Sequence, residues 1–240
     1  RNDGDFKFSN VNAESKLGGL GATYQAAWAD FDLDGDLDLV ITATYAGRPT
    51  DYYNGLGDGT FELRSYASGI DLRGGWGAAW ADVDLDGDPD LMASNGLYLN
   101  TRDDADKGHW LQVQPVGNVV SNRAAIGATV QVTAGELTRV GYINGGSGQG
   151  CQNALVALFG LGDATEISEI RVTYPAGETV TYEGPFDLDQ RLVVYEDGGV
   201  GQPLTTEDTE EEGDGDGEQD PDGDGEQDPD GDGEQDPDGD

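Results

Sequence analysis

The stretch AAWADFDLDGDLDL at residues 26–39 has a copy, AAWADVDLDGDPDL, at residues 78–91. Each copy places Asp at relative positions one, three, five and nine and Gly at position six. Alternate carboxylates on a tightly curled backbone converge on one point, and Gly supplies the sharp turn. Five aspartates within nine residues repel one another unless a cation lies among them. The spacing therefore predicts a calcium loop in each copy.

We expect one calcium ion in each loop, bound by carboxylates at positions one, three, five and nine. These are Asp30, Asp32, Asp34 and Asp38 in the first loop and Asp82, Asp84, Asp86 and Asp90 in the second. The backbone carbonyl groups of Asp36 and Asp88 are expected to complete the two shells. The alternative is a surface turn rich in aspartate that binds no metal, and two copies in one register favour the metal.

The flanks of both loops distinguish them from EF-hands, which end on a bidentate Glu at position twelve and lie between helices. Position twelve is Ile41 in the first copy and Ala93 in the second, and short apolar runs typical of strands flank each loop. A strand-loop-strand unit with a ninth-position Asp resembles the calcium loop of FG-GAP (VCBS) repeats. The resemblance implies that each unit forms one blade of a β-propeller.

Residues 1–8 resemble residues 53–61, which follow the first loop, and therefore look like the end of an earlier repeat. Blades bury their faces only against neighbours, and two units with a fragment cannot close a ring. We thus interpret residues 1–101 as part of a propeller with further blades upstream. Four aromatic residues recur around the loops, and they could form a ligand-stacking set or a core between blades: Tyr24, Trp28, Trp76 and Trp80. The core is the favoured interpretation.

From His109 onwards the repeat stops while the strand pattern continues. Seven short strands are predicted near residues 110–116, 128–133, 138–143, 155–159, 167–174, 179–183 and 191–195. Such a series in about ninety residues predicts a small β-sandwich over residues 108–197. The predicted fold class is accordingly all-β, a partial propeller followed by a sandwich.

This second region carries an ordered set of short motifs: HWL at 109–111, SNRAAIGA at 121–128, GGSG at 145–148, QN at 152–153 and FGLG at 159–162. The set resembles the ASPIC/UnbV domain, which commonly follows FG-GAP repeats in secreted proteins of the cartilage acidic protein type. Residues 149–151 depart from the family, which usually carries an aromatic-containing stretch there.

The chain is strongly acidic, with 49 acidic against 12 basic residues and a formal charge of -37. Because 19 of the acids lie between Glu207 and Asp240, residues 1–206 still carry 30 acids against 12 bases. Nucleic acid and anionic membranes are therefore poor partners, since both require a basic surface.

Calcium loops fill readily where calcium is near millimolar, as outside cells, so we expect a mature or excised piece of a secreted or surface protein.

Few other residues suggest chemistry. His109 is the only histidine, which excludes a His-rich transition-metal site, and it is interpreted as a packed or surface residue. The Gly-rich loop 144–150 lacks the Lys of a phosphate loop, and Ser147 fails the G-x-S-x-G spacing. Cys151, the only cysteine, can form no intrachain disulfide and has no neighbouring base in sequence. We expect a protein that is not an enzyme.

Residues 198–240 form an acidic tail in which an eight-residue Asp/Gly unit repeats. Its composition indicates a disordered polyanion, whereas its spacing repeats the loop pattern and resembles the calcium-binding units of thrombospondin type 3 repeats. The candidate ligands there are Asp220, Asp222, Asp224, Asp228, Asp230, Asp232 and Asp236. A tail ordered by calcium and a solvated spacer both stay open.

The favoured function is a secreted, calcium-binding interaction or adhesion protein whose partner is a protein or glycan at the cell surface or matrix. Two alternatives stay open: the substrate-binding portion of an extracellular enzyme with a cleft between its two regions, and a surface spacer that stores cations.

Overall fold

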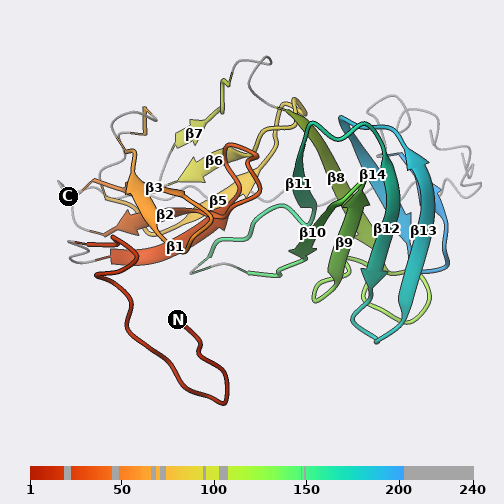
Figure 1. The fold of residues 1–240 in the computed structure, drawn as a ribbon, viewed down its shortest axis with the longest axis horizontal. Helices are drawn as coiled ribbons and strands as arrows, with labels where there is room; N and C mark the ends of the chain where they lie inside the picture. The colour runs from red at the N-terminus through yellow and green to blue at the C-terminus, as the bar shows by residue number, and fades with distance from the viewer. Residues whose placement is uncertain are drawn as a thin grey trace, which may run out of the picture. The chain divides into compact units, whose positions relative to one another are not determined.

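A computed structural model describes residues 1–18, 23–44, 49–65, 69–70, 74–93, 96–102, 108–146, 148 and 150–202. Within these ranges the protein contains strands and no α-helix, which confirms the all-β prediction (Figure 1). The chain divides into two units, Arg1–Pro203 and Leu204–Asp240. The candidate tail ligands between Asp220 and Asp236 lie outside the described residues. No helix of the described residues is long and apolar enough to cross a membrane.

Each calcium-loop motif lies between two antiparallel strands, as predicted. The first sheet, which we call the first repeat sheet, has the order β1-β2-β3-β4, formed by β1 (Thr23–Ala29), β2 (Asp38–Ala43), β3 (Asp51–Gly55) and β4 (Phe61–Leu63). The second repeat sheet has the order β5-β6-β7, formed by β5 (Ala78–Ala81), β6 (Asp90–Ala93) and β7 (Gly96–Tyr98). Trp28 pairs with Leu39 as Trp80 pairs with Leu91, so the two hairpins share one register.

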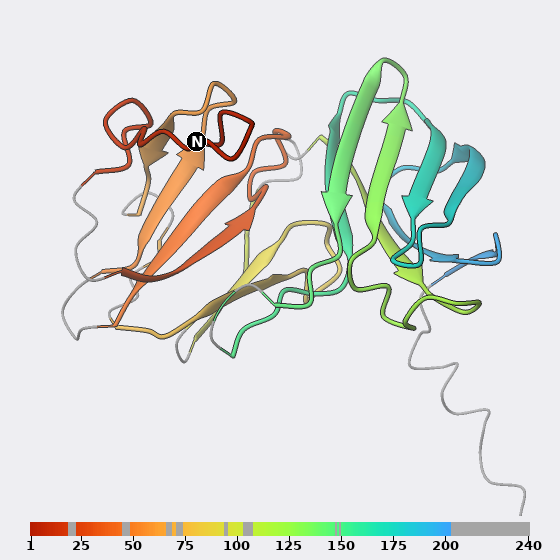
Figure 2. The same ribbon diagram turned by 90° about the horizontal axis from the view of Figure 1, so that it is seen from below.

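The two repeat sheets pack face to face, and a shared core lies between them (Figure 2). The first sheet contributes Ala27, Val40 and Tyr52, and the second contributes Ala78, Trp80 and Leu91. When two repeats stack, the first buries one face of its sheet and the second buries the opposite face of its own sheet, because the shared core lies between them. The two sheets are therefore arranged as neighbouring blades of a partial propeller.

This stacking explains why the four aromatic residues predicted as core behave differently. Trp80 is 4% exposed, whereas the equivalent Trp28 is 44% exposed because it lies on the outer face of β1. Tyr24 and Trp76 are also exposed, and their rings contact each other edge to face at 5.1 Å. The core interpretation is thus right for Trp80 and wrong for the other three in this structure.

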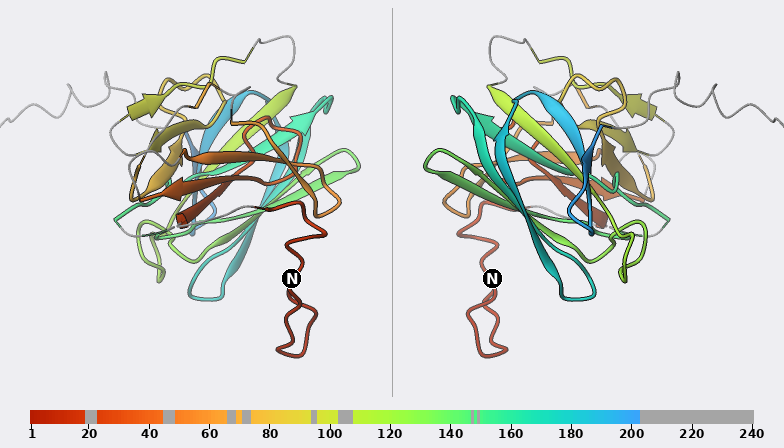
Figure 3. Two further views of the ribbon diagram at one scale, coloured as in Figure 1. Left: turned by 90° about the vertical axis from the view of Figure 1, so that its left-hand side faces the viewer. Right: turned by 90° about the vertical axis from the view of Figure 1, so that its right-hand side faces the viewer.

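The first residues of the chain add little to either repeat sheet. Residues 1–10 are exposed throughout, and Figure 3 shows this segment as a loop that stands away from the sheets. Asn2 and Phe8 form an isolated antiparallel bridge within it. Leu17 is the first residue to pack onto the core formed by Leu39, Ile41 and Tyr53.

The sandwich predicted for the second region is present, and it consists of two four-stranded sheets. One has the order β10-β9-β12-β13, formed by β10 (Leu137–Tyr142), β9 (Thr129–Ala134), β12 (Ile167–Thr173) and β13 (Thr179–Phe186). The other has the order β11-β8-β14-β15, formed by β11 (Ala157–Gly162), β8 (His109–Val116), β14 (Gln190–Tyr195) and β15 (Val200–Gly201). All pairs are antiparallel except β8 and β14. The prediction placed β11 two residues too early and omitted β15.

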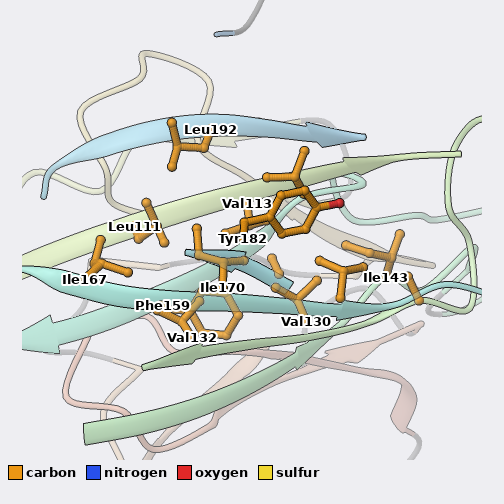
Figure 4. Close-up of a cluster of buried hydrophobic side chains, with 14 of the residues drawn as sticks. Leu111, Val113, Val130, Val132, Ile143, Phe159, Ile167, Ile170, Tyr182 and Leu192 are labelled. Atoms are coloured by element: carbon orange, nitrogen blue, oxygen red, sulfur yellow. The ribbon is translucent and has the colours of Figure 1, made fainter. Parts of the chain in front are cut away.

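The sandwich core lies between these sheets and consists mainly of aliphatic side chains, with one phenylalanine and two tyrosines (Figure 4). Ile170 and Val172 of β12 are buried while Arg171 and Thr173 are exposed, which confirms the predicted alternation of a strand with one wet face. The hydroxyl oxygens of the two buried tyrosines, Tyr174 and Tyr182, lie 2.9 Å apart. They lie 3.0 and 2.6 Å from the carbonyl oxygens of Val194 and Tyr195 in β14, and the two hydroxyl protons are shared among these acceptors. Their polar ends are therefore satisfied inside the core.

One buried acid fixes the loop after β8. The carboxylate of Glu196 accepts the backbone N–H groups of Val119, Val120 and Ser121 and the hydroxyl of Ser121, at 2.8 to 3.1 Å. Burial by itself raises the pKa of Glu196, but these hydrogen bonds to the charged form outweigh it and lower the pKa to about 2. The ionised carboxylate of Glu196 therefore accepts the backbone N–H groups of this loop, which a neighbouring strand would otherwise have to satisfy.

Candidate metal centre

The two predicted loops, Asp30–Asp38 and Asp82–Asp90, have the same backbone conformation. Position four is left-handed in both, with φ of 56° at Leu33 and 62° at Leu85. Position six is left-handed as well, with φ of 93° at Gly35 and 95° at Gly87. Leu can adopt the value near 60° at position four, but non-glycine residues strongly resist a φ near 95°, so the curl of the loop requires Gly at position six.

The first and last aspartates of each loop hold the curl in place. Asp30 Oδ2 accepts the N–H of Gly35 at 3.0 Å, and Asp82 Oδ2 accepts that of Gly87 at 3.1 Å. Asp38 Oδ2 accepts the N–H of Phe31 at 2.7 Å, as the second copy repeats with Asp90 and Val83 at 2.8 Å. The other oxygen of the ninth-position Asp ties the loop to the next strand or its end, through Gly55 N in the first copy and Asn100 N in the second.

Carboxylate oxygens converge in both loops, as the spacing predicts. In the first loop, one oxygen from each of Asp30, Asp32 and Asp38 lies within 4.8 Å of the others, and in the second the same holds for Asp82, Asp84 and Asp86. Of the predicted carboxylate ligands, Asp34 and Asp90 are outside these groups of three. Asp36 and Asp88 were expected to bind through backbone carbonyl groups, and the side chain of Asp88 is fully buried.

Both loops leave one buried carboxylate oxygen without a donor. Within the described residues, neither Asp30 Oδ1 nor Asp82 Oδ1 has a hydrogen-bond partner, although the Oδ2 atom of each is satisfied. A buried and unpaired polar oxygen is costly, and the cost rises when it is charged. The same atom is left over in both copies, as expected if it is a metal ligand.

The pKa values of the first loop also indicate that a cation lies among its carboxylates. Burial raises the pKa of Asp30 to about 8, with further contributions from Asp34, Asp38 and Asp32. Burial also raises the pKa of Asp38 to about 7, despite the N–H groups that it accepts from Gly55 and Phe31. An opposite charge among these oxygens reverses both effects. The donor set is all oxygen and mostly carboxylate, which suits a hard cation such as calcium.

The sandwich contacts both loops, which the sequence alone did not suggest. Gln112 in β8 donates through Nε2 to Asp82 Oδ2, and its own Oε1 accepts Arg191 Nε at 2.6 Å. Arg139 in β10 donates to the carbonyl oxygens of Asp34 and Gly35, at 3.2 and 3.3 Å.

Glycine makes this close approach possible. A Cβ atom at Gly35 would overlap the guanidinium group of Arg139, and one at Gly87 would overlap the indole ring of Trp110. Gly160 in β11 similarly lies against the carbonyl of Leu33 in the first loop. The two loops therefore form part of the surface on which the sandwich packs.

The two loops also contact each other through residues that follow β7. Asn100 binds both, because its N–H donates to Asp90 Oδ1 and its Nδ2 donates to the carbonyl of Phe31 at 3.0 Å. Arg102 donates to the carbonyl of Asp32 and lies 3.9 Å from the carboxylate of Asp88. Asn100 and Arg102 therefore link the two loops.

A cavity of about 210 Å³ lies beside the loops, between the repeat sheets and the sandwich. Asp30, Asp82 and Arg191 line it, together with Trp28 and Tyr142. The described residues that line it include no histidine, cysteine or serine, so none of the common nucleophile and base pairs is present there. The cavity presents two carboxylates and one guanidinium group among aromatic and aliphatic side chains.

The remaining candidates have structural surroundings. His109 Nδ1 lies 2.8 Å from Asp189 Oδ2, and Asp189 also accepts the N–H of Trp110, so this pair fixes the start of β8. Cys151 is partly buried and forms an isolated bridge with Gly148. Ser147 lies outside the described residues.

Comparison with protein families matches both regions. Residues 30–93 match the FG-GAP-like repeat, and residues 118–200 match the family described as ASPIC and UnbV. The chain therefore carries FG-GAP-like repeats followed by an ASPIC/UnbV domain, as its motifs predicted. FG-GAP repeats are typical of extracellular or surface proteins. No curated protein matches the sequence.

Proposed function

We propose that this protein is a secreted, non-enzymatic interaction protein whose two repeat loops each bind one calcium ion. The observation that carries the proposal is the buried Oδ1 atom of Asp30 and of Asp82, which has no donor among the described residues in either copy. The ion is bound by the converging carboxylates and by the carbonyl groups of Asp36 and Asp88. It supplies the positive charge that the buried oxygens lack.

Calcium acts on structure in this proposal. Each loop joins two strands of a repeat sheet and contacts the sandwich. An ion that orders the loop therefore also holds these two strands and the sandwich together. Binding to the native loops alone stabilises the folded state, by about 2.7 kcal/mol per site at one hundred times the dissociation constant. The folded state that calcium stabilises presents the surface to which a partner binds.

The partner is a protein or glycan of the cell surface or matrix. Net negative charge argues against nucleic acid and anionic membranes, as it does for residues 1–206 alone. The exposed aromatic pair of Tyr24 and Trp76 is the kind of surface that a partner covers. A surface spacer that stores cations is the alternative function of the protein.

Calorimetric titration of the full chain with calcium tests the proposal. The variant Asp30→Ala/Asp82→Ala keeps the tail and removes one ligand from each loop, so its heat is the background to subtract. We expect two sites in the difference between wild type and this variant. The proposal is refuted if the two proteins take up the same amount of calcium.

A single-loop variant adds a second readout. Asp82→Ala is expected to remove one of the two sites and to halve the increase in melting temperature that calcium causes. Magnesium is the control cation, because its preference for a small octahedral shell makes it a poor match for loops of many carboxylates. Equal responses to the two ions would argue for a cation store without specific sites.

A further inference from the structure

The contacts between the sandwich and the two loops lie at the backbone and side-chain groups that shape the loops. We infer that the sandwich completes both calcium sites, with Gln112 and Arg139 as positioning residues, so that ion binding and packing of the sandwich are thermodynamically linked. This inference rests on the proposed function, because it concerns the same two loops. It assigns a role to residues that belong to neither loop motif.

In the second loop, Gln112 determines which oxygen of Asp82 is free for the ion. Asp82 is 8% exposed, and its Oδ2 accepts both Gln112 Nε2 and the N–H of Gly87. The other oxygen, Oδ1, has no donor among the described residues. Two donors on one oxygen hold the carboxylate in a single orientation, which removes rotational freedom before the ion binds.

Arg191 in turn orients Gln112. Its Nε donates to Gln112 Oε1 at 2.6 Å, which leaves the Nε2 group directed at Asp82. The residues lie on β14 and β8, the two parallel strands of one sandwich sheet. The two residues that orient Asp82 are therefore paired across neighbouring strands of one sheet, an arrangement that supports precise ligand placement.

In the first loop, Arg139 holds the backbone. Its two terminal nitrogens donate to the consecutive carbonyl groups of Asp34 and Gly35. These carbonyl groups directly precede that of Asp36, which is the proposed backbone ligand. Fixing the two peptides before it restricts the direction of the third, because all three lie in the same tight turn.

Calcium binding and the packing of the sandwich on the loops are expected to strengthen each other. If the packed sandwich favours the ion-binding form of a loop, then the ion favours the packed sandwich by the same free energy. Calcium is therefore expected to tighten the junction between the FG-GAP-like repeats and the ASPIC/UnbV domain. Loss of calcium is expected to loosen it.

The test compares positioning variants with controls from the same strand or sheet. Gln112→Ala is paired with Gln114→Ala, which removes the same side chain two positions along β8, where no hydrogen bond to either loop is present among the described residues. Arg139→Ala is paired with Arg171→Ala, an exposed arginine of the same sheet that contacts Glu169 at 3.3 Å. All are measured in the full chain by calcium calorimetry and by melting with calcium or chelator.

We expect Gln112→Ala to weaken one of the two sites by about tenfold or more, the effect of one hydrogen bond to a charged group. Arg139→Ala is expected to weaken the other site, by less, because neutral carbonyl groups are its acceptors. Each variant also reduces the melting increment caused by calcium. A purely structural role would lower the melting temperature equally with and without calcium.

The outcomes separate this inference from the proposed function. Wild type that binds no calcium at the loops would overturn the proposed function and this inference together. Wild type with two sites, and positioning variants whose affinities equal those of their controls, would overturn this inference alone. Loss of affinity in Gln114→Ala equal to that in Gln112→Ala would overturn it as well.

Discussion

Replacing the position-six glycines by alanine tests how closely the sandwich packs on the loops. Both glycines have φ near 95°, so alanine at either position costs about 1–2 kcal/mol in backbone strain. At Gly87 the new methyl group also overlaps the indole of Trp110, and overpacking against a rigid ring adds about 1–3 kcal/mol. The expected loss is about 2–5 kcal/mol for Gly87→Ala.

Gly35→Ala is the matched comparison. There the methyl group meets the end of the flexible Arg139 side chain, which can move into solvent, where water replaces its two long hydrogen bonds. The loss is therefore expected to stay near the strain alone, about 1–2 kcal/mol. Both losses are a large share of the stability of a typical domain.

Urea unfolding followed by circular dichroism measures both losses, in calcium and again in chelator. The double variant Gly87→Ala/Trp110→Ala removes the overlap, so a coupling energy of about 1–3 kcal/mol is expected between its two changes. Equal losses for Gly35→Ala and Gly87→Ala, or no coupling with Trp110, would refute the account of β8 packed against the second loop.

Three further predictions concern the sandwich and the tail. Because the pKa of Glu196 falls from an ordinary value of 4.5 to about 2 on folding, its contribution to stability is complete above about pH 4.5 and is lost as the pH falls towards 2. Unfolding titrations of Glu196→Gln should lack that part of the pH dependence, and an unchanged profile would contradict the role of Glu196. Tyr174→Phe removes two buried hydrogen bonds and should cost about 1–3 kcal/mol in denaturant unfolding, whereas the exposed Tyr142→Phe should change stability by less than about 0.5 kcal/mol. Removal of residues 207–240 should leave the melting temperature of the remainder within error, since the acidic tail has almost no apolar side chains with which to pack; a clear shift would show that the tail docks on the body.

Local features of the fold could be predicted from the sequence. The Asp and Gly spacing gives the loop conformation, since position six has the left-handed backbone that Gly allows. Alternation around Ile170 and Val172 gives the buried face of β12. Such features depend on neighbours in sequence, and period and turn chemistry are sufficient to find them.

Features that depend on distant neighbours could not be predicted in this way. The equivalent residues Trp28 and Trp80 have the same local sequence but differ in exposure, because periodicity defines the two faces of a strand without saying which face is covered. Gln112 and Arg139 belong to no motif, and only the packing of β8 and β10 on the loops brings them to Asp82 and Gly35. The one indication in the sequence was a polar residue in the middle of a predicted sandwich strand, Gln112, which is buried in the structure.

The most direct test of the central claim is a crystal structure of the protein grown with calcium, with anomalous diffraction used to identify the ions. The account predicts one anomalous peak in each loop, bound by Oδ1 of Asp30 in the first and of Asp82 in the second at about 2.3–2.6 Å. Loops that keep the same fold in millimolar calcium but show no anomalous peak, with water or a side-chain donor beside these oxygens, would contradict it.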